Sequence, residues 1–579
     1  MKTDILKSTL LSGFFLLFFI VYNIIISSFF FIFKISISKY YVLLALALSI
    51  VSTTFLLKKE KLLSLHKFYY VIISIVLPIV IIFISFFLNG KIIDFSYDGN
   101  AYHKTTIGLL KNGWNPIYEK AEEFDNASEI DQVYIDGTKN VNWVNHYAMA
   151  SHIYQANIYA FTNNIECGKS INTLSIIILF LILFSFMALK LNKLLFPFLF
   201  GICAITYSVV SAQFLTTYID LLNYIYLTLL LISLFMLEFP NSQNKHLGFI
   251  LYFLCLLMTI NIKFNTFAYA GIFCLVYYIY VIIRVRKKKL DSQYFKRFTG
   301  LSIVGVIVGV LVIGIIYPKN TITNGHPFYP LFGEGKIDII TKEQPANFVN
   351  KSSIEKYFIS MFSQVENIHD ASGKKATLKI PFTIHQNEYE HIKTTDARMS
   401  GNGVLFSGIF IISLLIIVLL SRNTYKNHKE VFIMTTIILA TTCSLIVLFS
   451  ESWWARYFPV TYYFVLISLL YLYLNKNVAI KRTSYLLIFI ILINNFITFK
   501  ESVKYSYDLN YNANFEYQNM LQQASGKTID ITTPIYIGAY YDIYHDLENY
   551  NYKIIPHEDN LSDYNYLLSG LMYYKIESE

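Results

Sequence analysis

Long apolar runs, separated by short polar segments, dominate the hydrophobic pattern of this chain. Most of the runs are long enough for a helix to cross a hydrocarbon core about 30 Å thick. The pattern predicts about thirteen membrane-spanning helices. They are expected near residues 10–33, 40–57, 69–88, 171–189, 194–212, 217–238, 247–262, 266–283, 300–317, 404–420, 431–449, 458–474 and 483–499.

The distribution of Lys and Arg predicts the orientation of these spans. The first apolar run, 10–33, is too long for the core of a signal peptide and lacks a small-residue cleavage site, so we expect it to be retained. With the N-terminus in the cytoplasm, the cytoplasmic tails and loops carry 22 Lys and Arg, and the four short outer loops carry 4. Such an excess of basic residues on one side is typical of cytoplasmic loops.

This orientation places three long polar segments outside: the loops 89–170 and 318–403, and the tail 500–579. Aromatic and aliphatic residues recur every three or four positions in the first loop, which predicts helices lying on the membrane surface. The tail alternates strand-like runs with a helical stretch, which predicts a small α/β module. We therefore expect an all-α polytopic membrane domain, residues 1–499, and a small non-cytoplasmic C-terminal domain, residues 500–579.

Composition agrees with a membrane protein and excludes two other classes. The chain is 55% hydrophobic and 15% charged, with a mean hydropathy of +0.47, which is too apolar for a soluble globular protein. The net charge of +9 could suit nucleic acid, but the basic residues lie in short loops between spans, so no nucleic-acid partner is expected. Four of the five cysteines lie within apolar runs, without metal or redox spacing, so a disulfide framework is not expected.

The first outer loop begins with two aspartates, Asp94 and Asp98, directly after the third predicted span. Two neighbouring carboxylates could supply a general base or hold a divalent cation such as Mg²⁺ or Mn²⁺. Asp98 has a structural alternative as the N-cap of a helix over residues 99–111. Asp94 has no comparable structural role, so we favour it as a functional residue, although either could be the base. His103 lies one turn into this helix, where a packing role is more common than a ligand role.

Charged residues also stand at the outer ends of spans, where they are costly and therefore informative. Asp220, Lys263 and Arg456 occupy such positions, and Arg398 lies beside a glycine-rich turn that leads into a span. A single Lys or Arg at this depth is explained by its reach to lipid headgroups. Taken together, these cations suit a lipid-linked phosphate at the outer membrane surface.

Two further residues, His326 and Trp453, lie in outer segments. All four tryptophans fall outside in the predicted topology. Tryptophan at this level is typical of the aromatic belt at a membrane interface, and it also stacks on sugars, so both interpretations are open.

Short motifs over about residues 69–460 carry a likeness to a known family. They are YDGNAYH, NGWNPIY, HYAMASHIYQANIYAFTNNIECGKSIN, TTYIDLLNY, NIKFN, GHPFYPLFG, GNGVLFSGIF and WWARYFP. These motifs resemble the GT-C superfamily of integral-membrane glycosyltransferases, and more closely its bacterial members related to the dolichyl-phosphate-mannose and lipid A aminoarabinose transferases. The resemblance implies a sugar donor on a polyprenyl phosphate and a glycan, lipid-linked glycan or surface polymer as acceptor, at the outer face of a bacterial cytoplasmic membrane.

The resemblance also implies roles for individual residues. Asp94 or Asp98 matches the acidic position that activates the acceptor hydroxyl. Acidic residues are often adjacent in the superfamily, whereas here they are four apart, which leaves open both the identity of the base and the need for a metal. Direct displacement with a single base implies inversion at the anomeric carbon. The donor phosphate is expected at Arg456, Lys263 and Arg398, and substrate contacts at His103, Asp220, His326 and Trp453.

Two other functions remain as alternatives. O-antigen polymerases and ligases also act outside, but they typically rely on a large late loop with arginines. Here the long first outer loop is acidic, with ten Asp or Glu against six Lys between residues 89 and 170, which favours a GT-C enzyme. A glycolipid flippase or transporter would need ionisable groups deep within its spans, and the charged residues here cluster at span ends.

Overall fold

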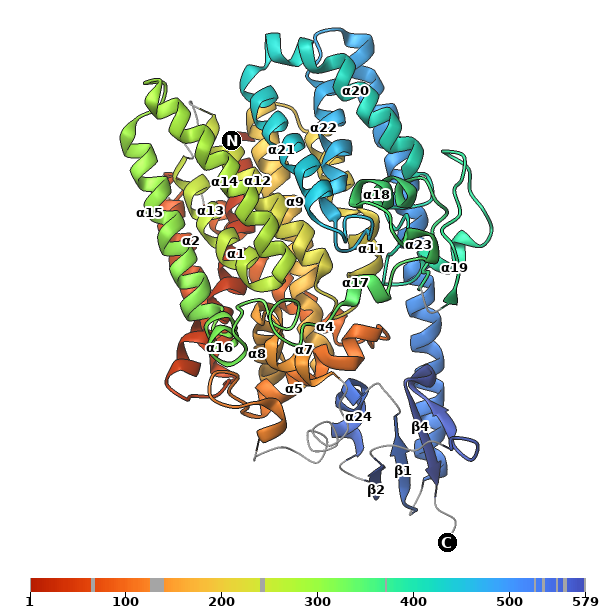
Figure 1. Cartoon of the computed structure of the whole chain (residues 1–579). Coiled ribbons are helices and arrows are strands. Elements are labelled where there is room, and N and C mark those ends of the chain that lie inside the picture. Colours follow the sequence, from red (N-terminus) through yellow and green to blue (C-terminus); the bar gives the residue numbers. More distant parts are fainter. Residues whose placement is uncertain are drawn as a thin grey trace.

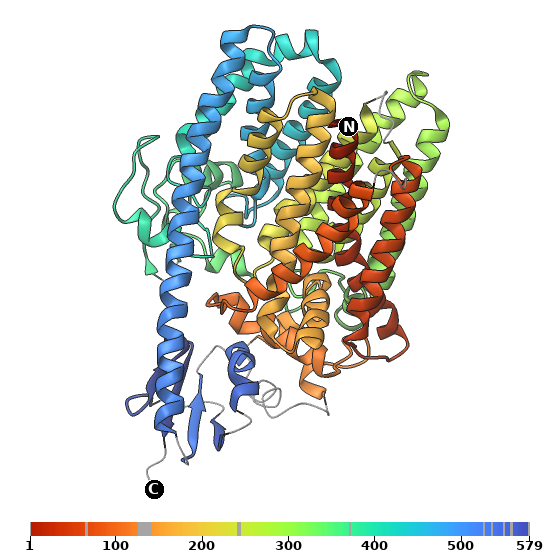
Figure 2. The same cartoon turned by 180° about the vertical axis from the view of Figure 1, so that it is seen from behind.

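The computed structural model describes residues 2–63, 68–124, 140–239, 245–369, 372–524, 527–533, 537–547, 550–555 and 560–576. It is mostly helical, with a large bundle and a small module at the C-terminus (Figures 1 and 2). Eleven helices in the described residues are long and apolar enough to cross a membrane. These helices are Lys2–Ile32 (α1), Tyr40–Lys59 (α2), Phe68–Asn89 (α3 to α4), Ile165–Leu191 (η5 and α9), Asp220–Glu238 (α12), Lys245–Ile262 (α13), Phe264–Arg286 (α14), Ser292–Ile313 (α15 and η6), Phe406–Asn427 (α20), Lys429–Leu448 (α21) and Val478–Gln523 (α23).

The eleven helices coincide with eleven of the predicted spans and confirm a multi-pass membrane protein. The ranges predicted at 194–212 and 458–474 contain shorter apolar helices, Leu195–Ile205 (α10) and Pro459–Tyr473 (η9 and α22). These two are shorter than the roughly 20 residues that a bilayer crossing needs. The total of thirteen spans therefore stays a prediction.

The helices differ in how far the bundle covers them. In the most apolar part of α12, 94% of the residues are buried, whereas the corresponding value for Ser292–Ile313 is 22%. The less covered helix packs against α13 through Gly305 and Gly309, where an added Cβ would lie 2.7 Å from side-chain atoms of Leu256 and Ile260. Small residues four positions apart allow such close approach in membranes, where burial of apolar surface gives little drive for helix association.

The first outer segment forms short helices beyond the spans: Gly99–His103 (η3), Lys104–Asn112 (α5), Val141–His146 (α7) and Ala150–Thr162 (α8). Figure 1 shows α5, α7 and α8 together at the end of the bundle opposite the N-terminus. The second outer segment contributes Ile316–Asn324 (α16), Ile339–Lys342 (α17), Ser353–Met361 (α18) and Glu388–Ile392 (α19).

The C-terminal part begins inside a span. Helix α23 continues for 46 residues, about 69 Å at 1.5 Å per residue, so it extends well beyond a bilayer core. The predicted domain boundary at 499/500 lies within this continuous helix. Beyond it, the strands Ile529–Thr532 (β1), Tyr552–Ile555 (β2), Asn565–Leu567 (β3) and Met572–Ile576 (β4) form a sheet of order β2-β1-β4-β3.

The predicted C-terminal module is therefore present, with one helix beside its sheet. Strands β1 and β2 are parallel, with Tyr540–Leu547 (α24) between them in the chain. Strand β4 pairs antiparallel with both β1 and β3. Figures 1 and 2 show the module beside the C-terminal half of α23, below the end of the bundle that carries α5.

Candidate functional site

A cavity of about 960 Å³ lies where the two long segments predicted to be outside meet one end of the helix bundle. Both charged and aromatic side chains line it. The charged ones include Asp98, Lys263, Lys336, Asp338, Lys342, Glu343, Asp396, Arg398, Glu451 and Arg456; the aromatic ones include Tyr97, Tyr102, Trp143, Tyr147, Tyr218, Phe264, Trp454 and Tyr457. Its volume lies at the upper end of the usual range for ligand pockets, about 300–1,000 Å³.

Arg456 is the centre of the charged part of the cavity. Its Nη1 lies 2.8 Å from Asp98 Oδ2 and 3.1 Å from Asp220 Oδ2, and its Nε lies 2.8 Å from Asp396 Oδ1. Burial alone lowers the pKa of Arg456, but Tyr457 and the carboxylates of Asp396 and Asp98 hold it well above its usual value. One buried guanidinium thus contacts three carboxylates from distant parts of the chain.

Two further cations flank Arg456. The ammonium of Lys263 contacts Asp220 and lies 3.8 Å from the centre of the Tyr457 ring. The guanidinium of Arg398 contacts Asp396 and has its central carbon 4.2 Å from the centre of the Trp454 ring. The three cations predicted from sequence therefore converge at one site.

Backbone hydrogen bonds hold the two arginine-bearing segments side by side. The amide of Ala455 donates to the carbonyl of Arg398 at 3.1 Å, and the amide of Arg456 donates to the carbonyl of Ala397 at 3.2 Å. Gly401 allows the tight turn that follows, because a Cβ there would lie 2.6 Å from the carbonyl of Ala397. The arginines are thus positioned by paired backbone as well as by their own ion pairs.

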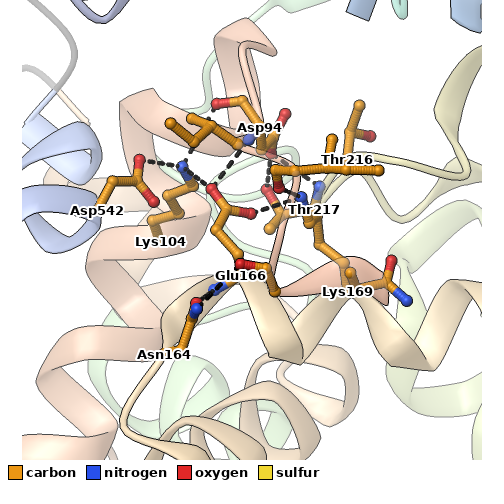
Figure 3. Close-up of polar contacts among 12 residues, drawn as sticks. Asp94, Lys104, Asn164, Glu166, Lys169, Thr216, Thr217 and Asp542 are labelled. Atoms are coloured by element: carbon orange, nitrogen blue, oxygen red, sulfur yellow. Dashed lines mark hydrogen bonds and ion pairs between the residues drawn. The ribbon is translucent and has the colours of Figure 1, made fainter. Parts of the chain in front are cut away.

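The two early aspartates have different environments. Asp94 is fully buried; its Oδ1 accepts from the Ser96 amide at 2.8 Å, and its Oδ2 accepts from the Thr217 amide at 2.8 Å and hydroxyl at 2.6 Å (Figure 3). Gly99 makes room for these contacts, because a Cβ there would lie 2.2 Å from Asp94 Oδ2. The expectation that Asp94 lacks a structural role is wrong, since it ties the first outer loop to the turn before α12.

Asp98 lines the cavity instead, with its side chain 15% exposed. It occupies the residue before η3, but its side chain makes no cap hydrogen bond. The cap interpretation of Asp98 is therefore wrong, and its carboxylate pairs with Arg456. Of the two aspartates, Asp98 is the one beside the candidate phosphate-binding cations.

His103 lies behind the wall of the cavity. It is buried, with its Nδ1 2.6 Å from His152 Nε2, and its ring packs beside Tyr102 and Tyr147. Burial, reinforced by Lys263 and Arg456, lowers the pKa of His103 to about 3, so the imidazole is neutral at physiological pH. His103 is not among the described residues that line the cavity, whereas Tyr102 and Tyr147 beside it are, and its contact with substrate stays a prediction.

Two other residues predicted to contact substrate, His326 and Trp453, do not line this cavity. His326 Nδ1 accepts from the amide of Phe328 at 3.1 Å, and its ring lies beside Phe332. Trp453 is fully buried and packs edge-on against Phe348. Neither is among the described residues that line the cavity; the neighbouring Trp454 lines it instead.

Sequence reasoning missed Asp396, which bridges Arg456 and Arg398. The sequence could have indicated Asp396, because it lies two residues before Arg398; in that segment only the arginine and the glycines were considered. It also missed the aromatic lining from Tyr97 and Tyr102, which immediately flank the predicted Asp98 site.

The described residues contain no group of three or more His, Cys, Asp or Glu side chains placed to hold a metal ion. The carboxylates of Asp94 and Asp98 have separate partners, Thr217 and Arg456, so joint binding of Mg²⁺ or Mn²⁺ would require both to leave those contacts. Comparisons with known protein families, curated proteins and solved structures find no match.

Proposed function

We propose that this protein is a membrane glycosyltransferase of the GT-C type. It moves a sugar from a polyprenyl-phosphate donor to a glycan or glycolipid acceptor on the outer face of a bacterial cytoplasmic membrane. The observation that supports the proposal is the 2.8 Å contact between the carboxylate of Asp98 and Arg456 in a cavity at one end of the helix bundle. A candidate base and a candidate phosphate-binding cation are thereby in one chamber.

The transfer is a direct displacement. The acceptor hydroxyl gives its proton to the Asp98 carboxylate as its oxygen attacks the anomeric carbon, and the bond from that carbon to the phosphate oxygen breaks. The electron pair leaves on the phosphate, whose growing negative charge is stabilised by Arg456 and Lys263. Attack opposite the leaving group inverts the anomeric configuration.

The contacts of Arg456 also suggest how the donor prepares the base. Without substrate, Asp98 shares the guanidinium with Asp220 and Asp396. A bound phosphate competes for the same nitrogen atoms. Once it takes the position facing Asp98, the carboxylate loses a cationic partner and becomes a better proton acceptor. The base therefore gains strength when the donor is in place.

The location of the charges favours transfer over transport. Asp98, Lys263, Asp396, Arg398 and Arg456 gather in one outer chamber. A path for a charged headgroup across the bilayer would instead need polar groups along the interior of the bundle. The aromatic side chains around the chamber offer stacking surfaces for sugar rings. An O-antigen-type polymerase or ligase remains an alternative within the same reaction class.

The test uses Asp98→Asn to trap the donor. Wild type, Asp98→Asn and the control Asp508→Asn, which alters an exposed carboxylate on α23, are purified from native membranes. Mass spectrometry of the extracted lipids is expected to find a polyprenyl-phosphate sugar enriched in Asp98→Asn. That lipid is then supplied to each protein in vesicles. Wild type and Asp508→Asn should release polyprenyl phosphate and transfer the sugar, whereas Asp98→Asn should not. Undiminished transfer by Asp98→Asn refutes the mechanism, and movement of intact donor across the bilayer indicates a transporter.

A further inference from the structure

The C-terminal module packs against the helix that follows Asp98, on the side turned away from the cavity. Ile537–Ala539 (η10) contacts η3, and a Cβ added to Gly538 would lie 2.7 Å from the carbonyl oxygen of Asn100 and 2.9 Å from Lys104 Cβ. Tyr541 of α24 lies on the next helix, since a Cβ on Gly108 would lie 2.1 Å from its ring. Both contacts leave no space for an extra methyl group, so module and loop are in close contact.

A buried group of charges joins the same elements (Figure 3). The ammonium of Lys104 lies 2.6 Å from Asp542 Oδ2 of the module and 2.7 Å from Glu166 Oε1. Glu166 also lies 2.7 Å from the ammonium of Lys169. Burial alone lowers the pKa of Lys104, but the carboxylates of Asp542 and Glu166 outweigh it and keep the ammonium charged. Removing one partner of such a group leaves an uncompensated buried charge.

The segment 94–104, which presents Asp98, is held at both of its ends. At its start, the Asp94 carboxylate accepts from Thr217, and the Asp94 amide donates to Glu166 Oε1 at 2.9 Å. At its end, Lys104 is held by Asp542 and Glu166. Asp98 lies between these attachments, and the Asn100 side chain closes the turn by donating to the Asp94 carbonyl at 2.7 Å.

A separate set of contacts ties the module to α23. In the turn between β3 and β4, the Ser569 amide donates to Glu516 Oε2 at 2.6 Å, and the Ser569 hydroxyl donates to the Leu509 carbonyl at 2.8 Å. The contact through Asp542 is therefore a second attachment, and it reaches specifically to the segment that carries Asp98.

We propose that Asp542 and Lys104 are positioning residues, through which the docked C-terminal module fixes the segment 94–104 and holds the Asp98 carboxylate toward the cavity. The effect on turnover rests on the proposed function; the effect on the segment does not. Asp542 acts through Lys104 and the backbone of this segment, at the side of the helix turned away from the cavity. Release of the module loosens the base, while Arg456 keeps its contacts with Asp220 and Asp396.

The experiment compares Asp542→Asn with Asp563→Asn in the full-length protein. Asp563 belongs to the same module, but its side chain is 71% exposed, so its replacement controls for loss of a module carboxylate. Hydrogen exchange is measured by mass spectrometry on peptides covering 94–104, α12 and β1. Asp542→Asn should accelerate exchange in 94–104 by about tenfold or more while α12 and β1 remain protected. Asp563→Asn should match wild type.

Kinetics supply a second readout. Because a small displacement of a catalytic group has a large effect on rate, Asp542→Asn should lower kcat about tenfold or more. KM for the donor should stay within about twofold, because the cavity cations are unchanged. Asp542→Glu, which restores the charge, should recover part of kcat. A structural lesion that merely lowers the amount of folded protein would not change the turnover of each folded molecule.

Gly538→Ala tests the same contact without altering any charge. Its methyl group would meet the Asn100 carbonyl and should displace the module, which gives the same faster exchange in 94–104. If Asp542→Asn also accelerates exchange in β1, its effect could come from unfolding of the module, and Gly538→Ala then tests whether the contact itself holds the segment. The inference is overturned if Gly538→Ala and Asp542→Asn both exchange hydrogen in 94–104 at the wild-type rate and both keep the wild-type kcat. If wild type transfers no sugar, the proposed function fails, and the exchange data still decide whether the module holds this segment.

Discussion

Replacing Asp98 and Asp94 separately by Asn should separate catalysis from folding. In Asp98→Asn, Arg456 keeps its contacts with Asp220 at 3.1 Å and Asp396 at 2.8 Å, so its charge remains compensated. We expect a change in the free energy of unfolding of about 1 kcal/mol or less. Loss of the base should lower turnover by about 10²–10⁴-fold, equivalent to roughly 3–5 kcal/mol of activation free energy.

Asp94→Asn should have the opposite effect: a large loss of stability and a small loss of turnover. Three donors, the amides of Ser96 and Thr217 and the hydroxyl of Thr217, converge on its two carboxylate oxygens. An Asn side chain retains one acceptor oxygen and turns an NH₂ group toward the remaining donors. Hydrogen bonds to a charged acceptor contribute about 1.5–3 kcal/mol each, so the expected loss of stability is about 3–5 kcal/mol. Turnover of each folded molecule should fall less than tenfold.

The assay pairs unfolding in detergent with sugar transfer normalised to the amount of folded protein. The expected pattern is a stable, inactive Asp98→Asn and a destabilised but active Asp94→Asn. The reverse pattern, in which Asp94→Asn is stable and inactive while Asp98→Asn transfers sugar at more than one tenth of the wild-type rate, would make Asp94 the base. The assignment of Asp98 as the base would then be wrong.

Three further predictions follow from other contacts. Arg456→Met should lower kcat about 10²–10³-fold by removing the charge that stabilises the leaving phosphate, with Arg456→Lys retaining more activity in the same transfer assay. The buried pair His103 and His152 should destabilise the protein in acid: burial lowers both pKa values, so the unfolded chain binds protons that the folded chain does not. Stability should therefore fall as pH drops below about 6.5. His103 should contribute a loss of about 2 kcal/mol at pH 5, and His152 should act in the same direction. The difference between the unfolding midpoints at pH 7.5 and pH 5 should be smaller in a double Gln variant. Gly309→Ala should cost about 1–3 kcal/mol in thermal unfolding by pushing against Ile260, whereas Gly300→Ala, where an added Cβ meets nothing within 4 Å, should be neutral or slightly stabilising.

The spans could be predicted from sequence because the length and polarity of each run are local properties. The gathering of Asp98, Lys263 and Arg456 at one membrane surface followed from the same topology, since alternate crossings fix which loops share a side. The helical extension of α23 beyond residue 499 was missed. That part of α23 lies beyond the apolar run and is polar, so its composition did not distinguish it from a separate domain.

The details of the site depended on contacts between distant segments. The roles of Asp94 and Asp98 differ because Thr217, more than a hundred positions later, supplies donors to only one of them. Likewise, Trp453 and Trp454 are adjacent, and the local pattern does not determine which ring faces the cavity. The fold of the segment after α21 turns Trp453 toward Phe348 and leaves Trp454 beside Arg398.

We propose that a lipid phosphate binds at Arg456, beside Asp98 as the candidate base. Equilibrium binding of a short-chain polyprenyl phosphate to wild type, Asp98→Asn and Arg456→Met tests it most directly. Asp98→Asn should bind at least as tightly as wild type, because a carboxylate that competes for the guanidinium is gone. Arg456→Met should bind about tenfold or more weakly, because a charge-assisted contact is lost. If Arg456→Met and wild type bind the polyprenyl phosphate with equal affinity, the phosphate does not bind at Arg456.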